Sequence, residues 1–384
     1  MNADSEPKEA PTRIYRQHDF DRSPMIVFYE ITTACDLACL HCRASAQPEP
    51  GPGELSPADS RRLVDQLSQF PRSPMLVLTG GDPLKRADVF DLIEYATNSG
   101  LEVSITPSAT PLVTETAVAR LHTSGISRMA VSIDGADAET HDPFRGVKGS
   151  FDRSLRILSA AREQGLATQV NTTVTPQNWK QLDAIAQRIA KEGIVLWSVF
   201  FLVPAGRASE AARLSPEQYE QVFAELATQS RRQPFRIKTT EAPHYRRYMI
   251  GQRKGAGARA KDLSTNRSAA PGVPMGINDG KGIMFISHAG EIYPSGFMPI
   301  LCGRFPTDNL VDIYTQSQLF QGLRDANRLQ GKCGQCEFRT ICGGSRARSY
   351  ALTGNPYAEE PDCAYEPEGL AVNKDQPPAD VNRG

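Results

Sequence analysis

The sequence predicts an α/β protein whose parallel sheet curves into three quarters of a barrel and is followed by a smaller C-terminal domain. Six short apolar runs alternate with amphipathic helical segments between residues 23 and 210, which is the pattern of strand–helix units joined by right-handed crossovers. Beyond about residue 205 we expect this alternation to stop. Six units rather than eight favour the partial barrel over a doubly wound open sheet, which remains the alternative.

The apolar runs are rich in Val, Ile and Phe, as buried parallel strands are. We expect strands at 25–31, 75–79, 101–106, 128–134, 167–174 and 194–203. We expect helices between them at 56–70, 88–100, 114–125, 150–165 and 178–193. The first of these helices opens with Ser56 as its N-cap and Pro57 at its first position. A site is predicted at the carboxyl ends of the strands, where such sheets bind their ligands.

Composition shifts divide the chain into predicted parts. They are a disordered tail at 1–22, the barrel at 23–210, a helical bridge at 211–281, a C-terminal domain at 282–365 and a second disordered tail at 366–384. Both tails are polar and lack apolar periodicity. Within the bridge, the Gly- and Ala-rich stretch 251–276 predicts a mobile loop. The C-terminal domain begins with two short strands around an Ala-Gly turn, and we expect a metal to organise the rest.

The charge balance argues against two classes of partner. The 384 residues include 43 Lys and Arg against 44 Asp and Glu, so no basic surplus indicates nucleic-acid binding. No apolar run approaches the roughly 20 residues of a membrane span. The polar N-terminal segment lacks the apolar stretch of a signal peptide. We therefore expect a cytoplasmic protein that binds neither nucleic acid nor membrane.

Three of the eight cysteines lie in the loop after the first predicted strand. Cys35, Cys39 and Cys42 have the spacing C-x3-C-x2-C. Three thiolates can hold three irons of a cubane and leave the fourth iron open, as a metal site needs in order to bind and activate a ligand. The open iron would suit chelation by the amino and carboxylate groups of S-adenosylmethionine. A three-cysteine zinc site is the alternative.

This triplet, with His41 as the aromatic residue before the last cysteine, resembles the hallmark of the radical S-adenosylmethionine (radical SAM) superfamily. The resemblance implies a partial (β/α)6 TIM-like barrel and a [4Fe–4S] cluster that cleaves S-adenosylmethionine reductively to methionine and a 5′-deoxyadenosyl radical. That radical abstracts hydrogen from a substrate C–H bond. An electron donor such as flavodoxin or ferredoxin would supply the reducing electron.

The segment TGGDPL after the second strand resembles the Gly-Gly-Glu-Pro motif of this superfamily. Gly80 and Gly81 let the backbone approach a ligand closely. By resemblance, Asp82 would accept a hydrogen bond from the methionyl ammonium. Its side chain is one methylene shorter than the Glu of the family motif. An ordinary strand-to-helix turn is the alternative, because Gly-Asp-Pro is common there.

The remaining cofactor contacts also follow from the resemblance. Ser132, at the end of the fourth strand, and Arg145 beyond it would contact the polar end of S-adenosylmethionine; Arg145 can grip a carboxylate with two hydrogen bonds. The ribose and adenine contacts are expected at Ser108, Asn171, Thr173, Leu202 and Val203.

Four further cysteines gather near the end of the chain. Cys333, Cys336 and Cys342 have the spacing C-x2-C-x5-C, and Cys363 follows. Four thiolates can close either a cubane or a zinc ion. The arrangement resembles the SPASM extension of radical SAM enzymes, which favours an auxiliary [4Fe–4S] cluster. The Gly343-Gly344 pair would let the loop wrap closely around it.

Departures from the full SPASM pattern reduce the expected number of clusters. The pattern carries seven cysteines and two auxiliary clusters, but here Ser295 and Arg346 stand at two of the cysteine positions. Gly296, beside Ser295, replaces the acidic residue that takes a substrate proton in some relatives. We therefore expect one auxiliary cluster, with Cys302 a buried or free thiol.

The substrate is open at this stage. Modification of a tetrapyrrole side chain is one hypothesis, because branches acting on haem or haem d1 resemble this chain, including its FFLVPAGR segment at 200–207. Maturation of a ribosomally made peptide, cluster-derived sulfur insertion, and a structural metal protein without catalysis are the alternatives. Propionate groups of a tetrapyrrole would need cations, which are present at Lys238, His244, Arg246 and Arg247. A solvated basic edge is the alternative for this segment.

Overall fold

The computed structural model describes residue 15, residues 17–255 and residues 276–368. Most of the predicted tails and of the loop at 251–276 therefore lies outside the described residues. Part of the expected N-terminal tail is instead ordered, because Gln17–Asp21 form a 3-10 helix, η1. The Phe20 side chain is buried, and the Tyr314 hydroxyl donates a hydrogen bond of 2.8 Å to its carbonyl oxygen.

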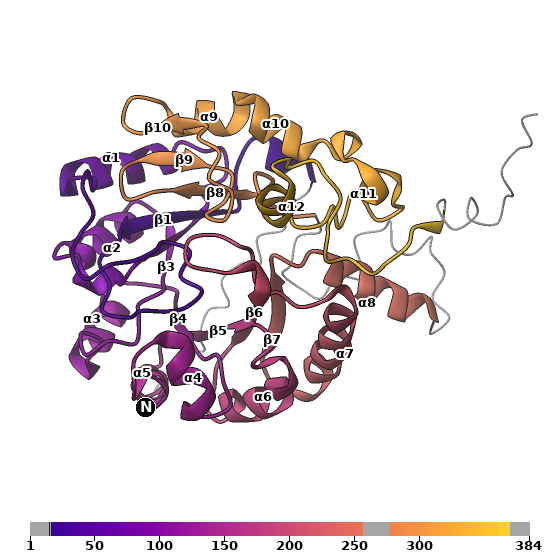
Figure 1. The fold of residues 1–384 in the computed structure, drawn as a ribbon. Helices are drawn as coiled ribbons and strands as arrows, with labels where there is room; N and C mark the ends of the chain where they lie inside the picture. The colour runs from indigo at the N-terminus through magenta and orange to yellow at the C-terminus, as the bar shows by residue number, and fades with distance from the viewer. Residues whose placement is uncertain (1–14, 16, 256–275, 369–384) are drawn as a thin grey trace, which may run out of the picture.

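A parallel sheet forms the centre of the described chain, as predicted, with helices on its outer side (Figure 1). Ten strands of the described residues follow the order β10-β9-β8-β1-β2-β3-β4-β5-β6-β7. They are β1 Ile26–Thr32, β2 Met75–Gly80, β3 Glu102–Ile105, β4 Arg128–Ser132, β5 Thr168–Val174, β6 Leu196–Phe201, β7 Arg236–Thr240, β8 Ile283–Ile286, β9 Glu291–Tyr293 and β10 Gly303–Arg304. The sheet is an unclosed partial barrel, because β7 and β10 are its two edges.

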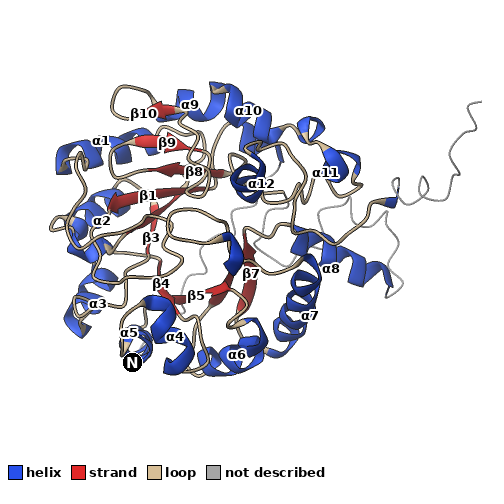
Figure 2. Cartoon of the chain, viewed as in Figure 1, coloured by secondary structure: helices blue, strands red, loops and turns tan. Residues whose placement is uncertain are grey.

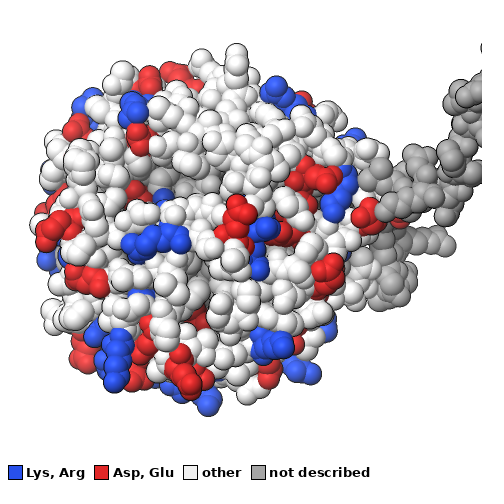
Figure 3. All heavy atoms as spheres, viewed as in Figure 1, with Lys and Arg blue, Asp and Glu red and all other residues white. Residues whose placement is uncertain are grey.

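The helices follow the predicted alternation and continue beyond it. In the barrel they are α1 Pro57–Leu67, α2 Val89–Asn98, α3 Glu115–Thr123, α4 Ala138–Arg145, α5 Ser150–Glu163, α6 Leu182–Ala190, α7 Pro216–Arg232 and α8 His244–Gly255. In the C-terminal region they are α9 Leu310–Gln316, α10 Gln318–Arg324, α11 Gly331–Gln335 and α12 Arg346–Thr353. None of the described helices is long and apolar enough to cross a membrane. Basic and acidic side chains are interspersed over the face shown in Figure 3.

Two expectations about the strands and helices were wrong. The alternation does not stop near residue 205, because α7 leads into β7, which pairs in parallel with β6. The strand β8 extends the other side of the sheet by pairing in parallel with β1, so the predicted C-terminal hairpin belongs to the barrel sheet (Figure 2). The short helix α4 was also missed, since Pro143 near its end reads as a turn signal.

The strands of the barrel have an outer and an inner face. Trp197 and Val199 of β6 are buried in the core that contains the helices, so the alternate residues face the inside of the barrel. Ser198 is one of these inner residues. In the register of the sheet, Ser132, Asn171, Ser198 and Lys238 are successive neighbours on β4, β5, β6 and β7. They form one row across the inner face, which we call the inner row.

A buried arginine joins the C-terminal region to the barrel. Arg348 of α12 is fully buried and donates hydrogen bonds of 3.1 Å to both carboxylate oxygens of Glu360. The same guanidinium donates to the carbonyl oxygens of Leu202 and Glu241, where β6 and β7 end, at 3.3 and 2.7 Å. Burial alone would raise the pKa of Glu360, but the charge of Arg348 reverses this and holds that pKa below its usual value.

We predict that Arg348→Met destabilises the protein strongly, because it leaves the Glu360 carboxylate buried without its counter-ion. Breaking a buried ion pair costs about 3–5 kcal/mol. The matched control is Arg62→Met, which removes an exposed arginine paired with Asp59 at 3.0 Å and should cost about 0–1 kcal/mol. Anaerobic urea unfolding measures both. Equal destabilisation by the two substitutions would show that Arg348 does not hold the C-terminal region.

Candidate active site

The N-terminal cysteine triplet lies in the loop that follows β1, at the carboxyl end of the sheet. Cys35 and Cys39 are buried and Cys42 is half-buried, and all three are free thiols. The backbone N–H groups of Leu37 and Ala46 donate to the sulfurs of Cys35 and Cys42, each at 3.4 Å. Such N–H···S bonds favour the thiolate form that iron requires. The three cysteines therefore fit the ligands of an open cluster.

The segment after β6 fastens this cysteine loop. Arg207 donates from Nε to the carbonyl of Cys39 at 3.0 Å and from Nη1 to that of Ala46 at 2.8 Å, and its backbone N–H donates to the carbonyl of Cys42 at 3.0 Å. Gly206 has a φ of 58°, and a Cβ there would collide with the Cys42 carbonyl. Arg207 is the last residue of the FFLVPAGR segment, and no role was predicted for it from the sequence.

The glycines of TGGDPL pack against protein backbone. The N–H of Gly81 donates to the Thr32 carbonyl at 2.8 Å, and that of Asp82 donates to the Ala34 carbonyl at 2.6 Å. A Cβ at Gly80 or Gly81 would collide with these same two carbonyls. The two glycines thus allow β2 to end directly against the start of the cysteine loop. The structure shows this close approach to protein backbone for both glycines.

The Asp82 carboxylate is already engaged inside the protein. It is buried, Oδ2 accepts a hydrogen bond of 2.6 Å from the Thr110 hydroxyl, and Oδ1 accepts from the N–H groups of Leu84 and Ser108 at 3.2 and 3.3 Å. Burial raises the pKa of Asp82 even so. Asp82 therefore holds the turn after β2 and positions Ser108, whose hydroxyl lies 3.3 Å from the sulfur of Cys35.

Arg145, at the end of α4, contacts both a carboxylate and a cysteine. It forms an ion pair with the fully buried Asp134, and its Nη1 lies 3.8 Å from the sulfur of Cys39. Beside it, the His41 ring stacks on Phe144 with centroids 4.2 Å apart. Desolvation lowers the pKa of His41 to about 3, so this imidazole is neutral. The arginine expected to grip the cofactor carboxylate is thus already neutralised by Asp134.

The remaining predicted contacts lie on two different faces. Ser132 and Asn171 belong to the inner row, and the Asn171 side-chain oxygen accepts a hydrogen bond of 2.7 Å from Gln169. Leu202 is buried where β6 ends. The structure therefore brings Ser108 to Cys35 and Arg145 to Cys39, while Ser132, the last residue of β4, pairs with Asn171 in the middle of β5.

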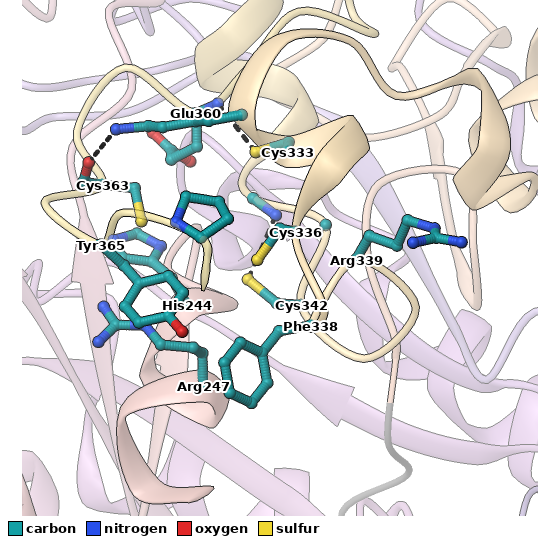
Figure 4. Close-up of a pocket in the computed structure, with 14 residues that line it drawn as sticks. His244, Arg247, Cys333, Cys336, Phe338, Arg339, Cys342, Glu360, Cys363 and Tyr365 are labelled. Atoms are coloured by element: carbon teal, nitrogen blue, oxygen red, sulfur yellow. Dashed lines mark hydrogen bonds between the residues drawn. The ribbon is translucent and has the colours of Figure 1, made fainter. Parts of the chain in front are cut away.

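The four C-terminal cysteines line one pocket, which is partly open to solvent. Figure 4 shows their sulfurs in the same hollow, with His244 and Arg247 of α8 on one side of it. The N–H of Glu360 donates to the sulfur of Cys333 at 3.3 Å, and the N–H of Gly344 donates to that of Cys342 at 3.4 Å. Four thiols around one hollow fit the ligands of a closed cluster.

His244 is an unsatisfied polar group of this pocket. It is 1 % exposed, and neither ring nitrogen has a hydrogen-bond partner. Burial lowers its pKa to about 3, so the ring is neutral and offers one N–H donor. An orphaned buried donor beside four cysteines fits a site whose occupant has acceptor sulfurs, as a cubane does.

The positions that depart from the full SPASM pattern are filled by hydrogen-bonded side chains. Arg346 donates to the carbonyls of Ala358 and Pro356 at 2.6 and 3.1 Å. The Ser295 hydroxyl accepts from the N–H of Phe297 at 3.1 Å. Cys302 is partly buried, which raises the pKa of its thiol to about 11.

The expected patch of cations does not form. Arg246 donates to the carbonyls of Ile277 and Ile341 at 2.8 and 3.1 Å, and Arg247 forms an ion pair with Glu220. His244 is neutral in the cysteine pocket. Of the four basic residues considered, Lys238 alone lies on the inner face of the barrel.

Comparisons with known proteins agree with this geometry. The model of the radical SAM superfamily matches residues 29–189. The chain belongs to the radical SAM superfamily, and it is therefore an enzyme that uses a [4Fe–4S] cluster and S-adenosylmethionine.

Two curated relatives are similar over almost their whole length. An AdoMet-dependent heme synthase of Methanosarcina barkeri is 36% identical over 90% of this chain and 97% of its own. A protein of the same name from Nitratidesulfovibrio vulgaris is 38% identical over 91% of this chain and 95% of its own. Streptococcus suis SuiB, solved with S-adenosylmethionine bound, shares the fold with a TM-score of 0.69 at 17% identity, over 90% of this chain and 78% of that one.

We predict that Arg207→Ala lowers the occupancy of the N-terminal cluster alone, because it frees the carbonyls of Cys39 and Ala46. Iron in the anaerobically reconstituted protein should fall from about eight toward about four atoms per chain. The iron content of Arg207→Lys should lie between those of the wild type and Arg207→Ala, since an ammonium cannot span both carbonyls as the guanidinium does. Unchanged iron in Arg207→Ala would contradict this role, and Arg62→Ala provides the control for a surface arginine.

Proposed function

We propose that this enzyme converts propionate side chains of an iron porphyrin into vinyl groups. The similarity over nine tenths of the chain to two proteins named AdoMet-dependent heme synthase carries the proposal. Haem bears two vinyl groups where coproporphyrin bears propionates, so a haem synthase acting on iron coproporphyrin must remove two carboxyl groups. The cysteine triplet and the four-cysteine pocket supply the two redox sites that such a reaction needs.

The change in each side chain balances as follows. A hydrogen atom leaves the carbon next to the ring and becomes part of 5′-deoxyadenosine. The remaining –CH•–CH2–COO⁻ group loses carbon dioxide and one electron and becomes –CH=CH2. Each vinyl group therefore consumes one S-adenosylmethionine with one reducing electron and returns one electron to an acceptor. When bound, the cluster and S-adenosylmethionine supply the 5′-deoxyadenosyl radical.

We assign the open cluster to Cys35, Cys39 and Cys42. The cofactor would lie over the ends of β2 to β6, where Gly80, Gly81 and Asp82 shape the turn and Ser108, Ser132, Arg145, Asn171 and Leu202 offer contacts. Because Arg145 is paired with Asp134 and Asp82 accepts three hydrogen bonds, we infer that these two act mainly by positioning the cysteine loop and Ser108.

We assign an auxiliary [4Fe–4S] cluster to Cys333, Cys336, Cys342 and Cys363, and propose that it accepts the substrate electron. A zinc ion held by the same four thiolates is the alternative. A flavodoxin or ferredoxin is the proposed electron donor, in the cytoplasm, where thiols stay reduced.

The cysteine assignments predict separate losses of iron. The reconstituted protein should hold about eight irons, and the combined change of Cys35, Cys39 and Cys42 to Ala should leave about four. That variant should release no 5′-deoxyadenosine. Cys363→Ala should keep the release of 5′-deoxyadenosine under dithionite but lose conversion of the porphyrin. Zinc in the C-terminal pocket, or about twelve irons, would contradict the assignment.

The substrate is tested by anaerobic incubation with iron coproporphyrin III, S-adenosylmethionine and dithionite. We predict a product that has lost two carboxyl groups, with two 5′-deoxyadenosine molecules formed for each haem. Release of 5′-deoxyadenosine that iron coproporphyrin does not stimulate, together with an unchanged porphyrin, would contradict the proposal. It would then favour the alternative substrate, a ribosomally made peptide.

A further inference from the structure

Two basic side chains face the inside of the barrel. On β7, Ile237 packs against the core that includes the helices, so Lys238 lies on the opposite, inner face. Thr240 shares that face, since its hydroxyl lies 3.1 Å from the hydroxyl of the inner residue Ser198. On β4, Met129 is buried in the same outer core, which places Arg128 on the inner face as well.

These two cations have no carboxylate partner among the described residues. Lys238 forms no ion pair or side-chain hydrogen bond there, and the charges that act on it are those of Arg128 and Arg236. Arg128 lies 3.9 Å from the sulfur of Met75, and the acid that acts on it, Glu102, is outside ion-pair distance. Desolvation, together with the charges of Arg128 and Arg236, lowers the pKa of Lys238 to about 8. A desolvated charge without a counter-ion is unfavourable until an anion binds.

The inner row places Lys238 at the level of the expected cofactor contacts. Ser132 and Asn171 lie on this row, and Lys238 follows Asn171 by two strands. Neighbouring strands are about 4.8 Å apart, so Asn171 and Lys238 are separated by about 10 Å along the sheet. Arg128 lies four residues before Ser132 on the same strand, deeper in the barrel.

We propose that Lys238 binds a propionate carboxylate of the porphyrin inside the barrel, with Arg128 adding positive charge beneath it. The inference rests on the proposed function and names the group that orients the substrate. An anion held by Lys238 offsets the positive charge that Lys238 and Arg128 place inside the barrel. It also directs the carbons of that side chain toward Ser132 and Asn171, where the hydrogen atom is removed. A charge-assisted hydrogen bond to a carboxylate is stronger than a neutral one, so it can fix a single side chain.

The test is a binding titration without S-adenosylmethionine, followed by the absorbance of the iron porphyrin. The probes are iron coproporphyrin III and its tetramethyl ester, which has no carboxylates. We expect Lys238→Gln to bind the acid at least tenfold more weakly than the wild type, and Lys238→Arg to retain most of the affinity. The ester should bind the wild type and Lys238→Gln equally. Lys191→Gln, which removes an exposed lysine, is the control.

A second measurement separates binding from folding. Because Lys238 lacks a counter-ion, porphyrin-free Lys238→Gln should unfold at or above the temperature of the wild type, with unchanged iron content. Lower thermal stability would show that Lys238 has a structural partner and would overturn the inference. Equal affinity of wild type and Lys238→Gln for the acid would overturn it as well, as would weakened binding of S-adenosylmethionine instead of porphyrin. A wild type that binds no iron coproporphyrin would contradict the proposed function itself, and the inference would fall with it.

Discussion

The contacts of the Arg348 guanidinium fix the C-terminal region against the barrel. It is buried and reaches four structural parts at once: Glu360, Asp362, the end of β6 and the end of β7. Glu360 in turn donates its N–H to Cys333, and the carboxylate accepts from the N–H of Ser345. Leaving the buried Arg348 guanidinium or the Glu360 carboxylate unpaired would be costly. These contacts therefore hold the C-terminal cysteines at a fixed place beside the ends of β6 and β7.

Because Arg348 holds the end of β7, this strand and the helix after it contribute residues both to the inside of the barrel and to the pocket of the four cysteines. Lys238 lies on the inner row of the barrel, and His244, six residues later, begins α8 in the pocket of the four cysteines. The turn between them contains Glu241, whose carbonyl accepts from Arg348. A substrate anchored on β7 would therefore lie between the loop where the radical forms and the pocket proposed to receive its electron. Arg207 lies in the segment after β6 and fastens the cysteine loop to that segment, because it donates to the carbonyls of Cys39 and Ala46.

Much of this arrangement was predictable from the sequence, and the rest depended on contacts between distant residues. The apolar runs predicted the six central strands, and the spacing of the cysteines predicted the two cysteine groups. The pairing of β8 with β1 was not predictable, because a short strand carries no sign of which neighbour it joins. The partners that Asp82, Arg145 and Arg246 have inside the protein were not predictable either, because they lie on other structural elements. The role of Arg207 was not predictable for the same reason, since its acceptors are backbone carbonyls of the cysteine loop, far earlier in the chain.

The central claim is that the radical acts on the carbon next to the ring in a porphyrin propionate. The most direct test uses iron coproporphyrin III deuterated at those carbons, with unlabelled S-adenosylmethionine and dithionite, and determines the isotope content of the 5′-deoxyadenosine by mass spectrometry. The account predicts one deuterium in the 5′-deoxyadenosine formed with each vinyl group. Vinyl product accompanied by unlabelled 5′-deoxyadenosine would contradict it.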